Sequence, residues 1–208
     1  MFGRVAIAAS GLLLALFSMV HLAGLGLAWW DPVGFERYAA ALHHAPRLPV
    51  AEGALLLPLL LHPAQALART LTNRAARGGG PAPRSRRLEG VEPLAALAGR
   101  LMPWSGGLLL LFLLVHLAQL RLRRPASGAE LAALRAVLAQ PPWLALYVAA
   151  GVALALHLLH GQESALRSLG LLHPRQAQAI RWVGRGLALL LGTGFALLPV
   201  VVLRGAVA

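Results

Sequence analysis

The sequence predicts an all-α integral membrane protein with five transmembrane helices in a single domain covering residues 1–208. Two observations carry this prediction. Of the 208 residues, 58% are hydrophobic and only 12% are charged, and the mean hydropathy is +0.69. So few charged residues cannot cover the surface of a water-soluble domain of this length. The apolar residues are also gathered into long runs, which is typical of membrane-spanning helices.

Five apolar runs define the predicted spans, at about 5–29, 50–68, 101–120, 143–160 and 183–203. Each is long enough to cross a hydrocarbon layer of roughly 30 Å at about 1.5 Å per residue. The first run is too long for the apolar part of a signal peptide, so we expect it to be retained as a span. The intervening segments contain Asp31-Pro32, the tract 77–83, Arg123-Arg124-Pro125 and His173-Pro174. These compositions predict turns and linkers rather than further helices.

The charge distribution predicts the orientation. The chain carries 19 basic residues, all arginine, against seven acidic ones, with a net charge of +12. Because the arginines lie between apolar runs, they indicate the positive-inside bias of membrane proteins and not a nucleic-acid surface. With the N-terminus inside, twelve arginines lie on the inner side and seven on the outer side. We therefore expect a multi-pass protein of the inner (cytoplasmic) membrane with a cytoplasmic N-terminus.

An internal repeat organises the histidines. The segment 10–23 recurs 95 residues later as 105–118, with ten of the fourteen positions identical. The shared residues include the Ser-Gly pair, a phenylalanine and a histidine, His21 in the first copy and His116 in the second. The same offset carries His62 onto His157. The first four spans thus form two two-helix halves with one histidine per helix, and the fifth span lies outside the repeat.

The depth of these histidines indicates their chemistry. His21 and His116 lie late in outward-running spans, and His62 and His157 late in inward-running ones. They form two level pairs separated by roughly 10–15 Å of depth. Buried ionisable side chains usually mark function in membranes. Two stacked haems, each with two imidazole ligands from facing helices, require this arrangement, so we expect the four-helix bundle to bind two b haems. The chain has no cysteine, so thiolate ligation of haem or of an iron–sulfur cluster is excluded.

The Ser-Gly pairs are predicted to lie beside one of the haems. Eleven residues turn a helix by about 1,100°, within roughly 20° of whole turns, so Ser10 and Ser105 face the same way as His21 and His116, about 16 Å nearer the inner side. That is the level of the other histidine pair. Gly11 and Gly106 would let a flat macrocycle approach the backbone there. The alternative is that these small residues only pack helices together.

The remaining histidines and glutamates have simpler interpretations. An isolated buried histidine often only bonds across helices, and His43, His44 and His173 are expected in loops. His160 lies three residues after His157, but the repeat maps it onto Gln65. We expect it to contact a haem propionate or a quinone oxygen, or to be an interfacial residue only. Glu36 or Glu52, near span ends, is a candidate for proton transfer to a quinone.

The chain resembles the five-helix, di-haem cytochrome b subunit of succinate dehydrogenases and fumarate reductases. The matching pieces occur in the order of that family: Ser10-Gly11 to His21, Phe35-Glu36-Arg37-Tyr38, Glu52 to His62, the run 100–106 to His116, the run 157–165, and Leu169-Gly170-Leu171. They span nearly the whole chain. One departure is Ala155, where some relatives carry a glutamate that moves protons two residues before the fourth ligand.

The resemblance implies specific ligands and partners. His21 and His116 would bind the distal haem, and His62 and His157 the proximal haem. The chain would relay electrons between an iron–sulfur subunit and quinone, beside a flavoprotein that holds FAD and carries out the succinate or fumarate chemistry. Two alternatives remain at this point: a cytochrome b of another membrane oxidoreductase, such as a hydrogenase or formate dehydrogenase, and a haem-free transporter or anchor with buried histidines.

The topology is testable by thiol labelling, because the chain has no cysteine of its own. In intact cells, a cysteine at Ser85 should be shielded from an impermeant thiol reagent, whereas one at Ser127 should react. The reverse labelling pattern would overturn the predicted orientation.

Overall fold

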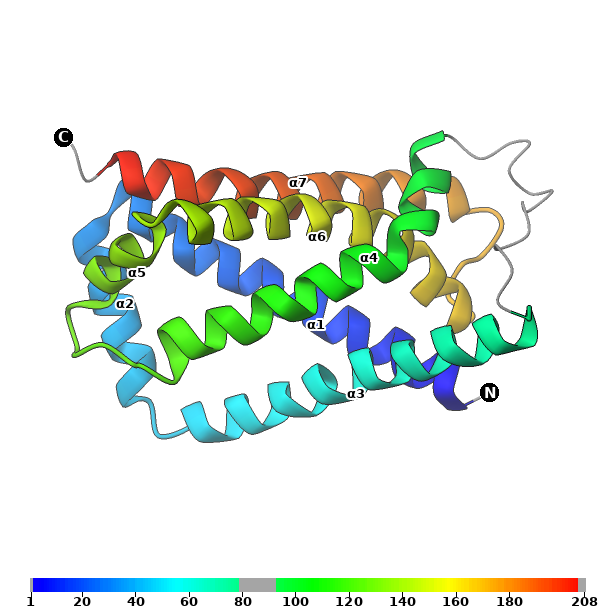
Figure 1. Ribbon diagram of the computed structural model, residues 1–208, viewed down its shortest axis with the longest axis horizontal. Helices are drawn as coiled ribbons and strands as arrows, with labels where there is room; N and C mark the ends of the chain where they lie inside the picture. The colour runs from blue at the N-terminus through cyan, green and yellow to red at the C-terminus, as the bar shows by residue number, and fades with distance from the viewer. Residues whose placement is uncertain (1, 79–92, 206–208) are drawn as a thin grey trace.

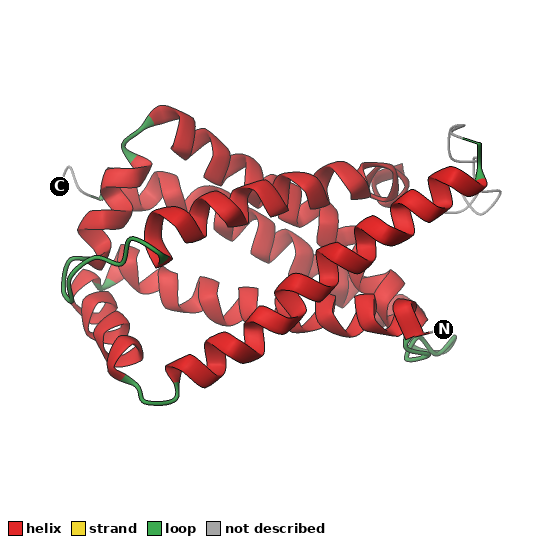
Figure 2. Ribbon diagram, turned by 60° about the horizontal axis from the view of Figure 1, so that its bottom comes forward, coloured by secondary structure: helices red, strands yellow, loops and turns green. Residues whose placement is uncertain are grey.

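The computed structural model describes residues 2–78 and 93–205. Five long helices dominate it: α1 (Phe2–Trp30), α3 (Leu48–Ala76), α4 (Pro93–His116), α6 (Pro141–Ser168) and α7 (Ala177–Arg204). Within the described residues there is no strand, as Figure 2 shows. Each long helix, with the π-helical turn η2 (Leu117–Arg121) prolonging α4, is long and apolar enough to cross a membrane. The prediction of an all-α protein with five spans is confirmed.

The predicted spans lie inside these helices, but most of the helices run further. The clearest case is α3, which continues past the apolar run through Arg69 and Arg74 to Ala76. The end of the hydrocarbon layer limits the apolar composition of a span and not the helix itself, whose backbone bonds are internal. Pro58 and Pro63 do not end α3 either.

Two segments expected to be turns and linkers contain short helices, and that expectation was wrong. The segment after Asp31 forms α2 (Pro32–His44), and the third connection contains α5 (Glu130–Leu138). Asp31 caps α2, because its Oδ1 accepts a hydrogen bond of 2.8 Å from the Gly34 amide, and Pro32 occupies the first helical position. An aspartate followed by a proline is typical of the start of a helix as well as of a turn.

The two segments that form α2 and α5 are equivalent positions of the repeat. The offset of 95 residues carries α2 onto 127–139, which contains α5. It also carries α1 onto α4 together with η2, and α3 onto α6, within about four residues at most of their ends. Each half of the repeat is therefore a unit of long helix, short helix and long helix. As a consequence, His43 and His44 form the last turn of α2, whereas His173 lies outside the helices as expected.

The contacts between the first four spans close a ring. Around it, α1 packs against α3 and α6, α4 packs against α6, and α3 touches α4 only lightly. The diagonal pairs are α1 with α4 and α3 with α6; among the described residues neither diagonal forms a substantial backbone interface. The ring matches the bundle predicted for the first four spans.

The fifth span, α7, packs outside this ring against α6 and α1. Its interface with α6 is the most extensive in the molecule and is built on small residues. Gly192 lies directly opposite Ala155, and Gly151 lies opposite the backbone of Ala196. Small residues let helix backbones approach closely in membranes, where the hydrophobic effect does not drive helices together.

The bundle has two ends, named here by the termini in Figure 1. The N-terminal end holds the start of α1 and the turn between α6 and α7. The C-terminal end holds α2, α5 and the end of α7. Ser127 lies exposed at the C-terminal end. Ser85, Arg84, Arg86 and Arg87 lie outside the described residues; Ser168 is an exposed labelling position at the N-terminal end.

The close α6–α7 contact yields a stability prediction. A Cβ at Gly192 has no room, whereas one at Gly186 on the same helix meets nothing within 4 Å. Gly192→Ala should therefore destabilise the protein by about 1–3 kcal/mol, lowering the apparent Tm in detergent by roughly 2–12 °C. The matched Gly186→Ala variant should leave the apparent Tm unchanged or raise it. Equal Tm values for the two variants would contradict this packing.

Candidate functional site

The four histidines of the repeat meet in two pairs inside the ring. His21 of α1 and His116 of α4 have ring centroids 6.1 Å apart, and so do His62 of α3 and His157 of α6. Each pair therefore spans one diagonal of the bundle. The first lies toward the C-terminal end and the second toward the N-terminal end.

The separation within each pair is that of two imidazoles facing one metal. A metal–nitrogen bond of about 2 Å on each side, with a ring radius of about 1.1 Å, puts the centroids about 6 Å apart. The imidazole planes are close to perpendicular, at 78° for His21 and His116 and 72° for His62 and His157. The described residues contain no group of three or more potential metal ligands. Two imidazoles are too few for a closed site made of protein ligands alone, but they complete an iron whose other ligands come from a macrocycle.

The tautomer of His62 is fixed by its neighbours. Its Nδ1 lies 3.1 Å from the carbonyl oxygen of Ile7, which can only accept, so Nδ1 carries the ring proton. The same nitrogen lies 3.3 Å from the Ser10 Oγ, whose own proton goes to the Ala6 carbonyl at 2.6 Å. The proton on Nδ1 leaves Nε2 with its lone pair available for a metal.

His157 has the equivalent arrangement in the second half of the repeat. Its Nδ1 lies 3.3 Å from the Ser105 Oγ, which donates to the Met102 carbonyl at 3.2 Å. The Met102 carbonyl and the His157 Nδ1 lie at almost equal distances from the Ser105 Oγ, which has one proton to give; when the carbonyl takes it, the serine accepts from Nδ1 and Nε2 keeps its lone pair. Both serines are buried, at 5% and 4% exposure, so each hydroxyl serves the histidine and its own helix.

The two glycines beside these serines lie against the imidazoles. A Cβ at Gly11 would come within 2.9 Å of the His62 ring, and one at Gly106 within 3.4 Å of the His157 ring. The room that the missing side chains provide is thus taken by the histidine of the neighbouring helix. Contact of either glycine with a macrocycle stays a prediction.

His116 is held by a chain of hydrogen bonds that the sequence did not predict. The Tyr147 hydroxyl donates to the Gln119 Oε1 at 3.2 Å and lies 3.1 Å from the His116 Nδ1. When the tyrosine gives its one proton to Gln119, it accepts from the His116 Nδ1. Gln119 lies in η2, and such π-helical turns are frequent at functional sites. The repeat maps Tyr147 onto Glu52, so self-similarity carries no indication of this role.

Aromatic rings support the pair at the C-terminal end. Phe17 and Phe112 each stack on the histidine four residues later, at 5.3 and 5.4 Å between centroids. This i, i+4 contact occurs at equivalent positions of the repeat. Phe195 of α7 also stacks on His21, at 6.2 Å, which brings the fifth span to the edge of the site.

His160 lies outside the pairs. Its side chain is exposed, one helical turn beyond His157, and its ring packs against Gly99 of α4, where an added Cβ would lie 3.1 Å from Nδ1. Its contact with a propionate or a quinone stays a prediction.

The two glutamates considered for proton transfer lie at the C-terminal end. Glu52 is bound in a two-pronged ion pair by Arg121, at 2.8 and 2.7 Å. Glu36 accepts from the amides of Glu130 and Leu131 at 3.3 and 2.9 Å, which caps α5 from α2. Burial, together with a hydrogen bond to Glu130, raises the pKa of Glu36. Glu130 accepts from the Gly128 amide at 2.7 Å and lies 3.1 Å from the His43 Nδ1.

Ala155, the position where some relatives of the resembled family carry a glutamate, faces α7. It lies directly opposite Gly192 in the tight α6–α7 interface. A glutamate side chain has no space there, so the alanine fits the packing of this chain.

Comparison with known proteins adds no further constraint: no family model, no curated protein and no solved structure matches the chain. The two histidine pairs, the fixed tautomer of His62 and the ring of helices that holds the pairs are thus the observations on which a function can be based.

Proposed function

We propose that the chain is a di-haem cytochrome b that anchors a succinate dehydrogenase or fumarate reductase in the membrane and relays electrons between an iron–sulfur subunit and quinone. His21 and His116 would hold one haem iron, and His62 and His157 the other. When bound, the haems supply one-electron transfer across the bundle.

The observation that carries this proposal is the combination of pair spacing and tautomer. Both pairs have the centroid separation of two imidazoles on one metal. Three of the four rings have Nδ1 within 3.3 Å of an oxygen that can accept its proton, and for His62 that oxygen is a carbonyl, which can only accept. Metal-binding histidines almost always donate the second ring nitrogen in this way, because the bond fixes the ring and strengthens it as a ligand.

The protein's own part in the chemistry is to position the proposed haems and to keep small molecules from their irons. The diagonals that carry the pairs lack a substantial backbone interface, so the two helices of each pair are not packed tightly together. With an imidazole on each side of an iron, neither site has an open position for a small molecule. This favours electron transfer over oxygen chemistry.

The partners are inferred from the resemblance and from charge. A flavoprotein with FAD and an iron–sulfur protein would dock at the N-terminal end, which would face the cytoplasm. Supporting this are the arginines described at that end: 4, 69, 74, 77, 100, 167, 175, 181 and 185. Such a field attracts an acidic partner surface and agrees with the positive-inside bias. Mass spectrometry of the native complex that finds hydrogenase or molybdenum subunits would refute these partners.

The haem content tests the proposal directly. The native preparation should contain two b haems per copy of this chain, measured by a dithionite-reduced spectrum and haem extraction against protein mass. A stoichiometry of two fits both histidine pairs. A value of one would show that only one histidine pair binds haem, and a value of zero would favour a haem-free transporter or anchor.

The choice between His157 and His160 is tested by paired variants. His157→Ala should remove the haem nearer the N-terminal end and keep the other, because it removes a ligand of one pair only. His160→Ala, the matched control one turn away, should keep both haems, with at most a shifted midpoint potential. Loss of that haem in the His160 variant, with retention in the His157 variant, would show that the ligand is one turn further along.

A further inference from the structure

The two histidine pairs differ in how their rings are held. In the pair at the N-terminal end, His62 and His157 each have Nδ1 within 3.3 Å of a serine hydroxyl on a neighbouring helix. In the pair at the C-terminal end, His116 has the Tyr147 hydroxyl in that place. The His21 ring is held by stacking and has no hydrogen bond within residues 2–78 and 93–205. Tyr147 is therefore the one hydrogen-bonding contact described for this pair.

Tyr147 is built into this position. It is 7% exposed, and its ring packs edge-to-face on Phe112 with 4.9 Å between the centroids. Its hydroxyl lies 3.1 Å from the His116 Nδ1 and 3.2 Å from the Gln119 Oε1. Because a buried hydroxyl is ordinarily hydrogen-bonded, both contacts matter for its orientation. The hydroxyl thus connects a ring nitrogen of one proposed ligand to an amide oxygen.

Gln119 is held by a turn that occurs in one half of the repeat. It lies in the π-helical turn η2. Arg121 of the same turn binds Glu52 of α3 through two hydrogen bonds, so the turn is fixed to a second helix. The equivalent residues 22–26 of α1 are ordinary α-helix, with Gly24 at the position of Gln119. The arrangement therefore belongs to His116 and is not shared by its repeat partner.

The three groups have two possible proton arrangements. The Gln119 Oε1 can only accept, and the Tyr147 hydroxyl has one proton to give. If that proton goes to the His116 Nδ1, the hydroxyl and amide oxygens lie 3.2 Å apart with no proton between them. If it goes to Gln119, Nδ1 donates to the tyrosine and both hydrogen bonds form. The second arrangement has two hydrogen bonds in place of one, and it leaves the His116 Nε2 with its lone pair.

We propose that Tyr147, oriented by Gln119, is a positioning residue for His116: it accepts the Nδ1 proton and so keeps the Nε2 lone pair available for a haem iron. This inference rests on the proposed di-haem function and names the residues that tune one of the two haems. A histidine that donates its second ring nitrogen is a stronger ligand, and a stronger ligand stabilises ferric over ferrous iron. Loss of the tyrosine hydroxyl should therefore raise the midpoint potential of the haem at the C-terminal end.

Redox titration of the haems in the native complex tests the role of Tyr147. Tyr147→Phe removes one oxygen and keeps the ring on Phe112. It should shift the ferric–ferrous equilibrium of one haem toward ferrous by about two- to tenfold, a rise of roughly 18–59 mV for a one-electron couple. That haem is identified as the one lost in His116→Ala.

The chain's other tyrosine supplies a matched control. Tyr38 packs against Gly24, where an added Cβ would come within 2.7 Å of its ring, and it has no hydrogen bond to a histidine in the described part of the chain. Tyr38→Phe should therefore leave both midpoint potentials unchanged. An equal shift in the two tyrosine variants would contradict a role specific to Tyr147.

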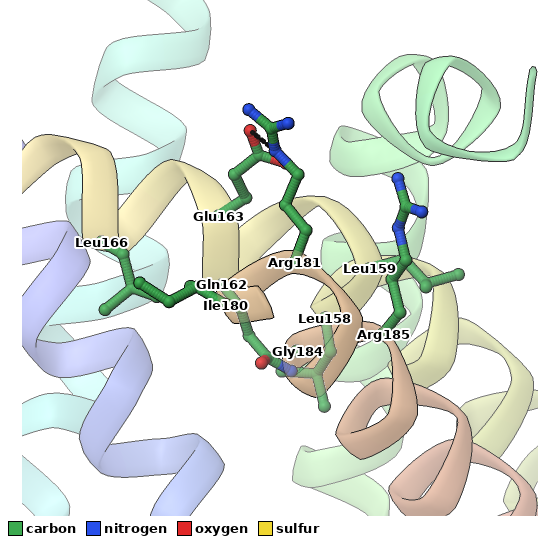
Figure 3. Close-up of a pocket in the computed structure, with 9 residues that line it drawn as sticks. All are labelled: Leu158, Leu159, Gln162, Glu163, Leu166, Ile180, Arg181, Gly184 and Arg185. Carbon is green, nitrogen blue, oxygen red and sulfur yellow. Dashed lines mark hydrogen bonds and ion pairs between the residues drawn. The ribbon is translucent and has the colours of Figure 1, made fainter. Parts of the chain in front are cut away.

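The role of Gln119 is tested by a double-mutant cycle. Gln119→Leu should raise the same midpoint potential, and combining it with Tyr147→Phe should raise the potential no further than Tyr147→Phe alone, because Gln119 acts through the tyrosine. Gln162→Leu is the matched control: Gln162 lies beside Gly184 in the cleft between α6 and α7, as Figure 3 shows, so it faces α7. Additive shifts of Gln119→Leu and Tyr147→Phe would contradict the chain of hydrogen bonds.

A variant in the other pair separates positioning from a general loosening of the fold. Ser105→Ala should change the midpoint potential of the haem held by His157 and not that of the haem held by His116. A shift of both haems in Tyr147→Phe, or no shift of either, in protein that contains two haems would overturn the positioning role and leave the proposed function standing. Wild-type protein without haem would overturn the proposed function, and this inference with it.

Discussion

The structure depends on four half-buried imidazoles that lie inside a bundle of helices long and apolar enough to cross a membrane. An unpaired polar group in hydrocarbon costs several kcal/mol, so each ring nitrogen needs a partner. The chain supplies partners for Nδ1 from its own backbone and hydroxyls: Ile7 and Ser10 for His62, Ser105 for His157, Tyr147 for His116. The opposite nitrogen, Nε2, would be the one to bind the iron of the proposed haem. The repeat places the histidines, the small residues beside them contact the rings on the Nδ1 side, and Nε2 would bind the proposed cofactor.

The second constraint is the placement of the helices that carry these rings. Among the described residues the diagonals of the ring form no substantial backbone interface, so they contribute little packing to the bundle. The interface outside the ring compensates, because α7 lies tightly on α6 through glycines and alanines. Phe195 of α7 stacks on His21, so the fifth span also contacts the histidine site. At the C-terminal end, α2 and α5 join the two halves of the repeat, with Glu36 capping α5.

Much of this could be predicted from the sequence, because two strong patterns carry it. Apolar run length predicts the five spans, and the 95-residue repeat predicts that His21 pairs with His116 and His62 with His157. The depth argument also put Ser10 and Ser105 at the level of His62 and His157, where the structure has them. These features depend on residue spacing and apolar run length, which are read directly from the sequence and combined with the fixed period of a helix and the thickness of a bilayer.

Other features were not predictable by those patterns. The short helices α2 and α5 are amphipathic and lack long apolar runs, so a search for spans passes over them, although Asp31-Pro32 is a helix start. Tyr147 and Gln119 come together only through the packing of α6 against the π-helical turn, and neither position is repeated. The room for Gln162 depends on Gly184 of another helix. Such contacts arise from the distance between helices, which periodicity does not determine.

Electron paramagnetic resonance of the oxidised native protein tests the central claim most directly, because it reports the ligands of an iron and the angle between them. If both histidine pairs bind haem, the near-perpendicular imidazole planes, at 78° and 72°, should give two strongly anisotropic low-spin ferric signals. A high-spin signal would indicate an iron with an open position. A single low-spin signal, or none, in protein with intact histidines would contradict the paired ligation on which the account rests.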